Sequence, residues 1–510
     1  MPSAARAKPD PLILALILIA GAAALRVFAL FVSPLELYPD EAQYWLWSRE
    51  LAWGYYSKPP MIGWLIAGST AIGGDAEAWV RLPATACHAG AALAVFATGA
   101  RLYDRWTGFW AAALYTLMPG VQLSGLVMST DAPLMLFLAL ALAAYAAFWR
   151  SPARRMAYAA AFGAALGLAF LSKYAALYFV AGAVLHALLD GDIRRAWSPA
   201  ALLAAVGALA LVAAPNLLWN AANGFSTVAH TAAESNWNDP DLFGPVQLLE
   251  FVGAQFGVFG PVPFGVLLAG AVGLGARRRL APEDTALLIF TAIPLAVVAA
   301  QAFISGANAN WAAAAYVPGS VLTAAWLVRW RARRLTAAAV GIQAVLGVLF
   351  LGVVSSPAIA AAVGADNGLK RARGWAETTE AVVARLQASP GWTAVATDNR
   401  FLFNALAYYG RDVFGRPGAP PLTIWVRKGS PQSQAETTDP LTAALDGRVL
   451  VASIVPDYRP LMAGDFVRWR PLGASEPRLD RKRTREVAFF EASGYRPAPR
   501  DPVSGLPKAP

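Results

Sequence analysis

The chain has 510 residues, of which 57% are hydrophobic and only 15% are charged, and its formal net charge is +10 at pH 7. Apolar runs of about 20 residues, the length a helix needs to cross a bilayer, recur over the first two thirds of the chain. A soluble protein could not bury so much apolar surface, so the composition predicts a polytopic membrane protein.

The apolar runs predict an all-α membrane region of about 11 to 13 transmembrane helices. The run 246–275 is overlong and contains Gly260-Pro261-Val262-Pro263, so it is either one kinked helix or a re-entrant piece followed by a helix. In chain order we expect spans near 11–32, 82–101, 106–124, 133–149, 155–171, 174–189, 198–218, 246–275, 285–304, 310–328 and 335–355.

The basic residues between these spans predict the orientation. Most of them fall on the side that holds the N-terminus, which is typical of the cytoplasmic side. The opposite loops carry Arg49, Lys58, Arg81 and Lys173. We therefore expect a multi-pass protein of the bacterial inner membrane with a cytoplasmic N-terminus, and the positive charge needs no nucleic-acid partner.

After residue 355 the chain becomes more polar. The stretch 375–388 has a helical pattern, whereas 392–397, 422–426 and 448–454 are strand-like. The sequence thus predicts a small C-terminal α/β domain, which the span count places in the periplasm.

The expected organisation has three parts. Residues 1–355 form the transmembrane domain, with a first periplasmic loop at 33–81; residues 356–495 form the periplasmic domain; and the Pro-rich end 496–510 is expected to be a disordered tail. Cys87 is the single cysteine, so no disulfide is available within the chain.

Chemistry-bearing residues gather in the predicted outer loops. Asp40 and Glu41 are followed by Lys58, which stands before two prolines; Asp131 and Lys173 lie at the next two outer turns. Cations stabilise the growing charge of a departing phosphate, and a carboxylate accepts a proton from an incoming hydroxyl. This grouping favours transfer of a group from a lipid-linked phosphate.

Five motifs occur in order between about residue 20 and residue 330. The first is PDEAQYWLWSRELAWGYYSKPP at 39–60, and the others are WVRLP at 79–83, STDAP at 129–133, FLSKY at 170–174 and ANW at 309–311. Together they resemble the bacterial branch of the protein O-mannosyltransferase superfamily, glycosyltransferase family 39. These are GT-C-fold enzymes that include the aminoarabinose and galacturonic acid transferases of lipid A.

The resemblance implies a role for each matched residue. Asp40, with Glu41 as its partner, and Asp131 would be the catalytic acidic residues. The donor phosphate would be bound by Lys58, Arg81 and Lys173. The implied reaction moves a monosaccharide from a polyprenyl-phosphate donor to a lipid A or other lipopolysaccharide acceptor on the periplasmic side, with inversion at the anomeric carbon.

Other residues are candidates for the substrate pocket. Arg26 is a charge inside the first span, where it would pair with a carboxylate or face the donor phosphate. The remaining candidates are Tyr55, Tyr56, His230 and Trp311. No cofactor is firmly predicted, and a divalent metal would have to rely on carboxylates.

Several alternatives stay open at this point. Lys58 and Lys173 could be interfacial lysines, Arg81 a simple anchor, and Asp131 part of an N-cap formed by Ser129-Thr130-Asp131. The acceptor could be a protein hydroxyl instead of a lipopolysaccharide. A secondary transporter would also have about eleven spans, but its charges are expected near the midplane.

Overall fold

The computed structural model describes residues 9–237, 242–276, 280–445, 447–501 and 505–506. The chain divides into two compact units. The first comprises Met1–Ser33 and Lys58–Ser355, and the second comprises Pro34–Ser57 and Ser356–Pro510. The segment Pro34–Ser57, expected to belong to the membrane domain as part of its first loop, thus clusters with the C-terminal residues.

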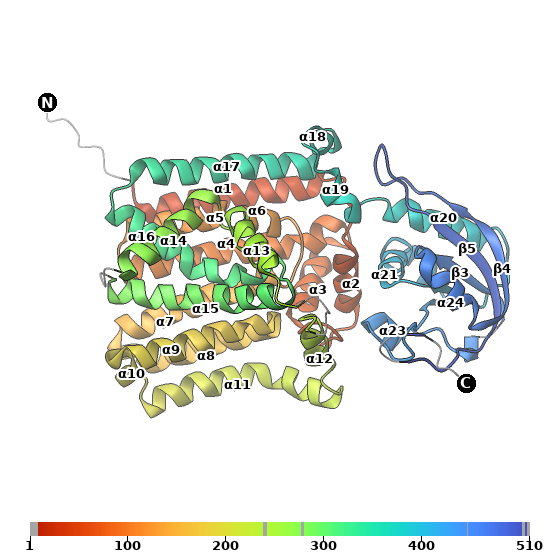
Figure 1. The fold of residues 1–510 in the computed structure, drawn as a ribbon, viewed down its shortest axis with the longest axis horizontal. Helices are drawn as coiled ribbons and strands as arrows, with labels where there is room; N and C mark the ends of the chain where they lie inside the picture. The colour runs from red at the N-terminus through yellow and green to blue at the C-terminus, as the bar shows by residue number, and fades with distance from the viewer. Residues whose placement is uncertain (1–8, 238–241, 277–279, 446, 502–504, 507–510) are drawn as a thin grey trace. The chain divides into compact units, whose positions relative to one another are not determined.

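The first unit is helical (Figure 1). Its helices are α1 (Pro11–Val32), α3 (Met61–Gly73), α4 (Glu77–Leu102), α5 (Arg105–Leu117), α6 (Pro119–Ser124), α7 (Asp131–Arg150), α8 (Arg155–Ser172), α9 (Leu177–Leu189), α10 (Gly191–Ala196), α11 (Pro199–Ala222), α12 (Ser226–Ala233), α13 (Pro245–Val258), α14 (Pro261–Ala276), α15 (Pro282–Ser305), α16 (Tyr316–Arg329) and α17 (Arg333–Ser355). Three 3-10 turns, η1 (Pro152–Arg154), η2 (Tyr174–Ala176) and η3 (Ala309–Ala315), precede α8, α9 and α16.

Eight helices in the described residues are long and apolar enough to cross a membrane, and the pair α13–α14 makes a ninth if it is one span. This pair is bent by 118°, at Gly260 with φ +100° before Pro261. The expected spans 106–124 and 174–189 are helical, but their longest helices, α5 and α9, have only 13 residues each and are too short to cross a membrane. The first breaks at Met118, whose extended backbone is the conformation that a following proline favours.

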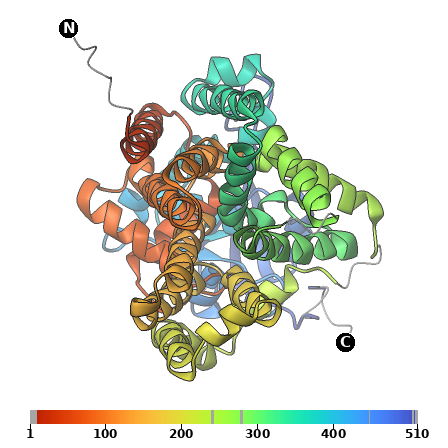
Figure 2. The same ribbon diagram turned by 90° about the vertical axis from the view of Figure 1, so that its left-hand side faces the viewer.

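Small residues allow the helices of this bundle to pack closely. Helix α4 contacts α1, α5 and α7, and α8 lies between α7 and α11 (Figure 2). At Gly163 on α8, an added Cβ atom would lie 1.9 Å from the carbonyl oxygen of Ala205 on α11. Close approach through small residues is how helices associate in lipid, where no hydrophobic force acts between them.

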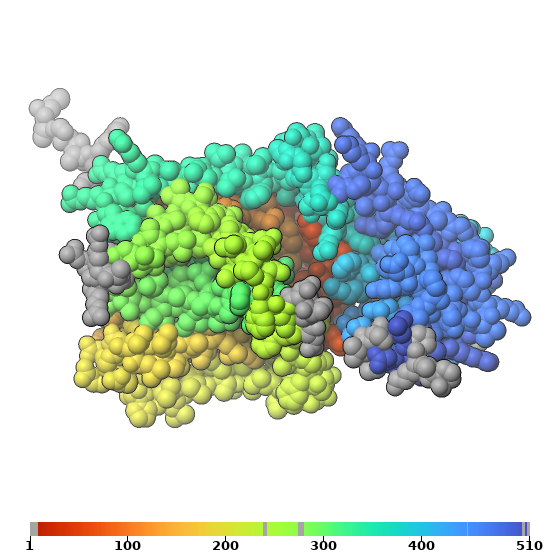
Figure 3. Space-filling model, in the orientation of Figure 1, coloured from red at the N-terminus to blue at the C-terminus, as the bar shows by residue number. Residues whose placement is uncertain are grey.

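The outer side of α11 is apolar and exposed. Leu203, Leu211 and Leu218 are each more than two thirds exposed, and the yellow-green atoms of this helix lie on the surface in Figure 3. Such a surface suits contact with lipid chains.

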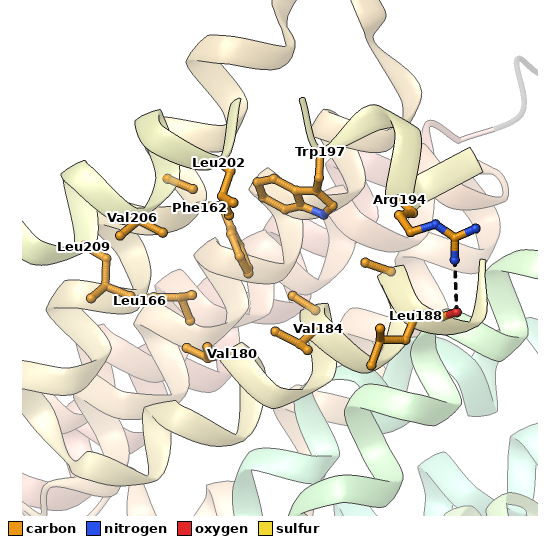
Figure 4. A pocket seen from close by; sticks show the side chains of 14 residues that line it. Phe162, Leu166, Val180, Val184, Leu188, Arg194, Trp197, Leu202, Val206 and Leu209 are labelled. Carbon is orange, nitrogen blue, oxygen red and sulfur yellow. Dashed lines mark hydrogen bonds between the residues drawn. The ribbon is translucent and has the colours of Figure 1, made fainter. Parts of the chain in front are cut away.

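An apolar hollow of about 290 Å³ lies between α8, α9 and α11 (Figure 4). Arg194 stands at one end, where its guanidinium donates a hydrogen bond of 3.4 Å to the carbonyl of Leu188. The hollow could hold hydrocarbon but offers no carboxylate for catalysis, so it is not the candidate active site. Its apolar lining includes Phe162, Leu166, Val184, Trp197, Leu202 and Val206.

The second unit is an α/β domain, as expected for its C-terminal part. Its five strands are β1 (Ala394–Thr397), β2 (Leu422–Ile424), β3 (Val449–Ser453), β4 (Phe466–Ser475) and β5 (Val487–Tyr495), in the order β2-β1-β3-β5-β4. Its helices are α2 (Pro39–Arg49), α18 (Pro357–Ala362), α19 (Asp366–Leu369), α20 (Trp375–Gln387), α21 (Arg400–Tyr409), α22 (Arg411–Phe414), α23 (Gln434–Thr438) and α24 (Arg459–Ala463). Three 3-10 turns, η4 (Lys370–Ala372), η5 (Ala443–Leu445) and η6 (Pro456–Tyr458), complete it.

The predicted helix and three strands match α20, β1, β2 and β3. β1 pairs in parallel with β2 and β3, whereas β5 pairs antiparallel with β3 and β4. The last two strands were not expected from the sequence. Alternate β1 residues face the two sides of the sheet, so Val395 packs on the side of α20 and α21 while Ala396 packs with Met462 of α24.

The expected disordered tail is partly packed in the structure. Ala498 donates a backbone hydrogen bond to Asp465, and Arg500 is 7% exposed, pairs with Asp465 at 2.5 Å and lies over Trp425. The expectation is therefore wrong for 498–500, because a buried ion pair fixes this stretch. Residues 502–504 and 507–510 lie outside the described residues.

Candidate active site

Asp131 is the centre of a polar cluster in the first unit. It is the first residue of α7, and its Oδ1 accepts a hydrogen bond of 2.7 Å from Nζ of Lys173. Its Oδ2 accepts one of 2.8 Å from Nδ2 of Asn310 in η3. The N-cap position belongs to Thr130, without a side-chain hydrogen bond, so the structure does not show the alternative in which Ser129-Thr130-Asp131 caps this helix.

Lys173 reaches Asp131 because α8 ends there. Lys173 is the C-cap of α8 and has extended backbone angles, which turn the chain into η2. The next residue, Tyr174, anchors this corner to the end of α11 through hydrogen bonds with Asn216 at 3.2 Å and Asn220 at 3.1 Å. The lysine is thus held by two packed helices rather than lying loosely at an interface.

Lys58 belongs to a second polar cluster. Its Nζ donates to Oε1 of Glu234 at 3.2 Å, and Nε2 of His230 lies 3.4 Å from the same oxygen. Partial burial would raise the pKa of Glu234, but the bonds with His230 and Lys58 outweigh it and lower the pKa to about 2. Glu234 is therefore a carboxylate at any ordinary pH.

Both clusters lie at the C-terminal end of α15. The backbone oxygen of Ser235, next to Glu234, accepts a bond of 2.9 Å from Gln301 of α15, whose side chain also donates to the carbonyl of Gly306. Asn310 follows Gly306 by four residues, which span at most about 14 Å. Two cation–carboxylate pairs therefore share one end of the helical unit.

Asp40 and Glu41 lie in the second unit, at the start of α2. Oε2 of Glu41 accepts a hydrogen bond of 2.9 Å from the backbone nitrogen of Tyr38, the N-terminal half of a capping box, and its side chain is buried. Asp40 is half exposed, and its Oδ1 accepts a bond of 3.1 Å from Nη1 of Arg400. Asp40 is thus the carboxylate of this pair that is open to solvent.

Tyr55 and Tyr56 anchor the end of the segment Pro34–Ser57 within the second unit. The hydroxyl of Tyr55 donates to the carbonyl of Trp47 at 2.7 Å, and the two rings stack with centroids 4.5 Å apart. The hydroxyl of Tyr56 donates to the carbonyl of Pro431, and its backbone nitrogen to Oε1 of Gln434. These contacts support a structural role in addition to the substrate contact expected from the sequence.

Arg26 is buried within the first unit. Its guanidinium donates to Oε1 of Gln122 at 2.9 Å and to the carbonyl of Thr116 at 2.6 Å. The expected carboxylate partner is therefore replaced by neutral oxygens in the described structure. A charge inside the bundle is kept only when such groups solvate it.

Arg81 and Trp311 are also placed by packing. Arg81 is 2% exposed on α4, so it is not the surface anchor considered from the sequence. Trp311 packs in a cluster with Phe251 and Ala302, and its neighbour Asn310 supplies the polar contact to Asp131. Within the ANW motif, the asparagine is thus the residue that reaches the acidic cluster.

Sequence reasoning missed four residues of these clusters as site residues. Asn310 stood inside a quoted motif, and Glu234 stood four residues after His230, so both carried a local signal. Gln122 and Arg400 carried none, because they meet Arg26 and Asp40 only through tertiary packing. Within the described residues, no group of three His, Cys, Asp or Glu side chains could hold a metal ion.

Comparison with known proteins gives the family. Residues 57–219 match the family described as dolichyl-phosphate-mannose-protein mannosyltransferase. The chain is also 35% identical over 439 residues to the lipid A galacturonosyltransferase RgtD of Rhizobium johnstonii, covering 85% of this chain and 89% of that protein. The chain belongs to this glycosyltransferase family.

Solved structures show the same fold. ArnT from Cupriavidus metallidurans is 16% identical in its apo state, with a TM-score of 0.63, and in its undecaprenyl phosphate complex, with a TM-score of 0.64; each covers 93% of this chain and 97% of that chain. The oligosaccharyltransferase of Archaeoglobus fulgidus is 14% identical, with a TM-score of 0.51, over 86% of this chain and 69% of that one. The glycosyltransferase therefore has the GT-C fold expected from its motifs.

Proposed function

We propose that this glycosyltransferase moves a monosaccharide from a polyprenyl-phosphate donor to a lipid A-type acceptor on the periplasmic side of the inner membrane. The observation that carries the proposal is the pair of cation–carboxylate clusters, Lys58–Glu234 and Lys173–Asp131, at one end of α15. A prenyl phosphate has its chain in the bilayer and its charge at the surface, which suits lysines at one end of a bundle of membrane helices.

In the proposed reaction, an acceptor oxygen forms a bond to the anomeric carbon on the face opposite the phosphate. The bond between that carbon and the phosphate oxygen breaks, and its electron pair stays on the departing prenyl phosphate. Lys58 and Lys173 stabilise this charge, an effect worth about 10²–10³ in rate for one well-placed donor. Arg81 is the further cation that the motifs imply for this role.

The carboxylates have a different task. We assign to Asp40, from its motif, the activation or orientation of the acceptor group, and to Asp131 the positioning of Lys173 and Asn310. If the acceptor is a lipid A phosphate, it is already anionic and needs no strong base, so Asp40 mainly orients it. If the acceptor is a hydroxyl, Asp40 takes its proton, a role typically worth about 10²–10⁴ in rate.

Galacturonic acid is the first sugar to test, because the relative RgtD is a lipid A galacturonosyltransferase. A protein hydroxyl is the second candidate acceptor, supported by the description of the matching family as a protein mannosyltransferase. The fold does not decide between them, because one fold supports several acceptors.

The deciding experiment compares a deletion strain with its parent by mass spectrometry of lipid A, core oligosaccharide and secreted proteins. We expect lipid A to lose one monosaccharide in the deletion strain and to regain it when the gene is restored. Loss of a sugar from secreted proteins alone would move the proposal to the protein acceptor. An unchanged sugar content in all three fractions would overturn it.

A further inference from the structure

Within the second unit, the motif residue Asp40 contacts a residue far along the chain. Nη1 of Arg400 donates to Oδ1 of Asp40 at 3.1 Å and to Oε1 of Gln43 at 2.9 Å. Asp40 and Gln43 stand one turn apart on α2, whereas Arg400 is the first residue of α21. The first-loop acid is thus held by the C-terminal part of the chain.

This contact is built into packed structure on both sides. Nδ2 of Asn404, one turn further along α21, donates to the carbonyl of Pro39 at 3.3 Å, and the ring of Trp45 meets that of Tyr408 edge-on at 4.9 Å. Asn399 caps the N-terminus of α21 through a bond of 2.7 Å to the nitrogen of Phe401. The positions of both side chains are therefore set by two helices locked against each other.

Stability alone does not explain Arg400. A cation in the first turn of a helix opposes the helix dipole. The ion pair is also largely in water, with side chains 39% and 52% exposed for Arg400 and Asp40, and exposed pairs contribute about 0–1 kcal/mol to stability. The ion pair with Asp40 therefore adds little to the stability of the fold, although Arg400 also bonds the buried side chain of Gln43.

The geometry instead suits control of a reactive carboxylate. In the described structure, Arg400 engages Oδ1 of Asp40 through a single nitrogen, and the same nitrogen holds Gln43. This one-point contact restrains the rotamer of the carboxylate and leaves Oδ2 available to an acceptor group. A small misplacement of a catalytic group by a residue that does not touch the substrate can lower the rate by about 10²-fold.

We propose that Arg400 is a positioning residue that holds the carboxylate of Asp40 in the orientation used for sugar transfer. This gives the C-terminal domain a task in the reaction, which its sequence did not reveal. The inference rests on the proposed function, because it requires Asp40 to act on the acceptor.

A double-mutant cycle tests this inference with full-length enzyme in detergent, a polyprenyl-phosphate sugar and lipid A. We expect Arg400→Gln to lower kcat about 10-fold or more while changing the donor KM less than about 2-fold, and Arg400→Lys to recover part of the loss. In an Asp40→Asn background, Arg400→Gln should change kcat less than about 2-fold, because its effect passes through Asp40. If Asp40→Asn turns over too slowly to measure, Arg400→Gln in the wild-type background decides, and a wild-type kcat for it would overturn the inference.

Arg448→Gln is the matched control. Arg448 lies in the same domain and forms a partly exposed ion pair at 3.1 Å with Glu491, which belongs to β5. It should keep wild-type kcat, and thermal unfolding should show that all variants remain folded. If Arg400→Gln unfolds the domain, Arg400→Met takes its place, and a wild-type kcat for that variant would overturn the inference.

The remaining outcomes separate the inference from the proposed function. Equal effects of Arg400→Gln in the wild-type and Asp40 backgrounds would show a separate role and overturn the inference. Wild-type kcat for Arg400→Gln, with loss of activity for Asp40→Asn, would overturn it and leave the function standing. Absence of sugar transfer by the wild-type enzyme would overturn the function itself.

Discussion

Lys173 donates a hydrogen bond of 2.7 Å from its ammonium to the carboxylate of Asp131, although 42 positions separate the two residues. The lysine ends one membrane helix and the aspartate begins another, so the chain enters and leaves the apolar region on the same side at this contact. A third element supplies Asn310 to the other carboxylate oxygen. This arrangement holds the ammonium group of Lys173 in place at the end of α8.

Asp131→Asn should lower kcat by about 10²-fold, because Lys173 loses the anion that fixes its position for the phosphate. Steady-state assays of sugar transfer measure this. Asp192→Asn, which removes an exposed carboxylate paired with Arg195 on α10, should retain wild-type activity. Full activity of Asp131→Asn would exclude a role for this cluster in the reaction.

Lys58→Ala should lower kcat/KM for the donor by about 10²–10³-fold, since the departing phosphate loses a stabilising charge. Undecaprenyl phosphate should also bind more weakly, which a competition assay measures. Lys482→Ala, at an exposed position in the second unit, provides the comparison. Turnover at the wild-type rate by Lys58→Ala would remove the proposed phosphate site.

Glu234→Gln should increase the affinity for undecaprenyl phosphate by about 5-fold, because a negative charge 3.2 Å from Nζ of Lys58 no longer repels the phosphate. Product inhibition should become stronger, and kcat should fall if product release limits turnover. Glu283→Gln, which removes the partner of Arg150 at the other end of α15, should leave the inhibition constant unchanged. Weaker inhibition of Glu234→Gln would mean that Glu234 orients Lys58 rather than competing with phosphate.

The same carboxylate should not titrate in the working pH range. The pKa of Glu234 is lowered from 4.5 to about 2, so its favourable bonds are present above 4.5 and are lost only as the pH falls through about 2. Wild-type and Glu234→Gln enzymes should therefore show parallel pH profiles of kcat/KM between pH 5 and 8. A step in this range that only the wild type shows would contradict the lowered pKa.

Gly163→Ala should destabilise the membrane unit by about 1–3 kcal/mol, because the added methyl group meets the carbonyl of Ala205 and forces α8 and α11 apart. Gly207→Ala on α11 is the matched control, since nothing lies within 4 Å of its added Cβ atom. It should be neutral or stabilising, as alanine is the better helix former. Thermal unfolding in detergent measures both variants, and equal melting temperatures would contradict the close packing.

Introduced cysteines test the orientation. Because the native Cys87 is buried, a membrane-impermeant maleimide should react in intact spheroplasts with Asn236→Cys but not with Asp192→Cys. Both positions are exposed, and the distribution of basic residues places them on opposite sides of the membrane. The reverse labelling pattern would put the lysine clusters in the cytoplasm.

The sequence by itself determined the class of fold, because the length of an apolar run is fixed by the thickness of the bilayer. It predicted α1 at its observed bounds and α20, β1 and β3 within a few residues, since periodicity is a local property. It also singled out Asp40, Lys58, Asp131 and Lys173 as candidate site residues, because their motifs are short and continuous. The helix break at Met118 and the strands β4 and β5 were not anticipated.

Only the tertiary structure decided which charges meet. Arg400 reaches Asp40 across 360 positions, and Lys58 reaches Glu234 across 176. No local pattern encodes such pairs, because each depends on how separate helices pack and on which carboxylate lies within about 3 Å of a given cation. The assignment of Pro34–Ser57 to the second unit has the same origin, since its side chains pack against α21, which lies far along the chain.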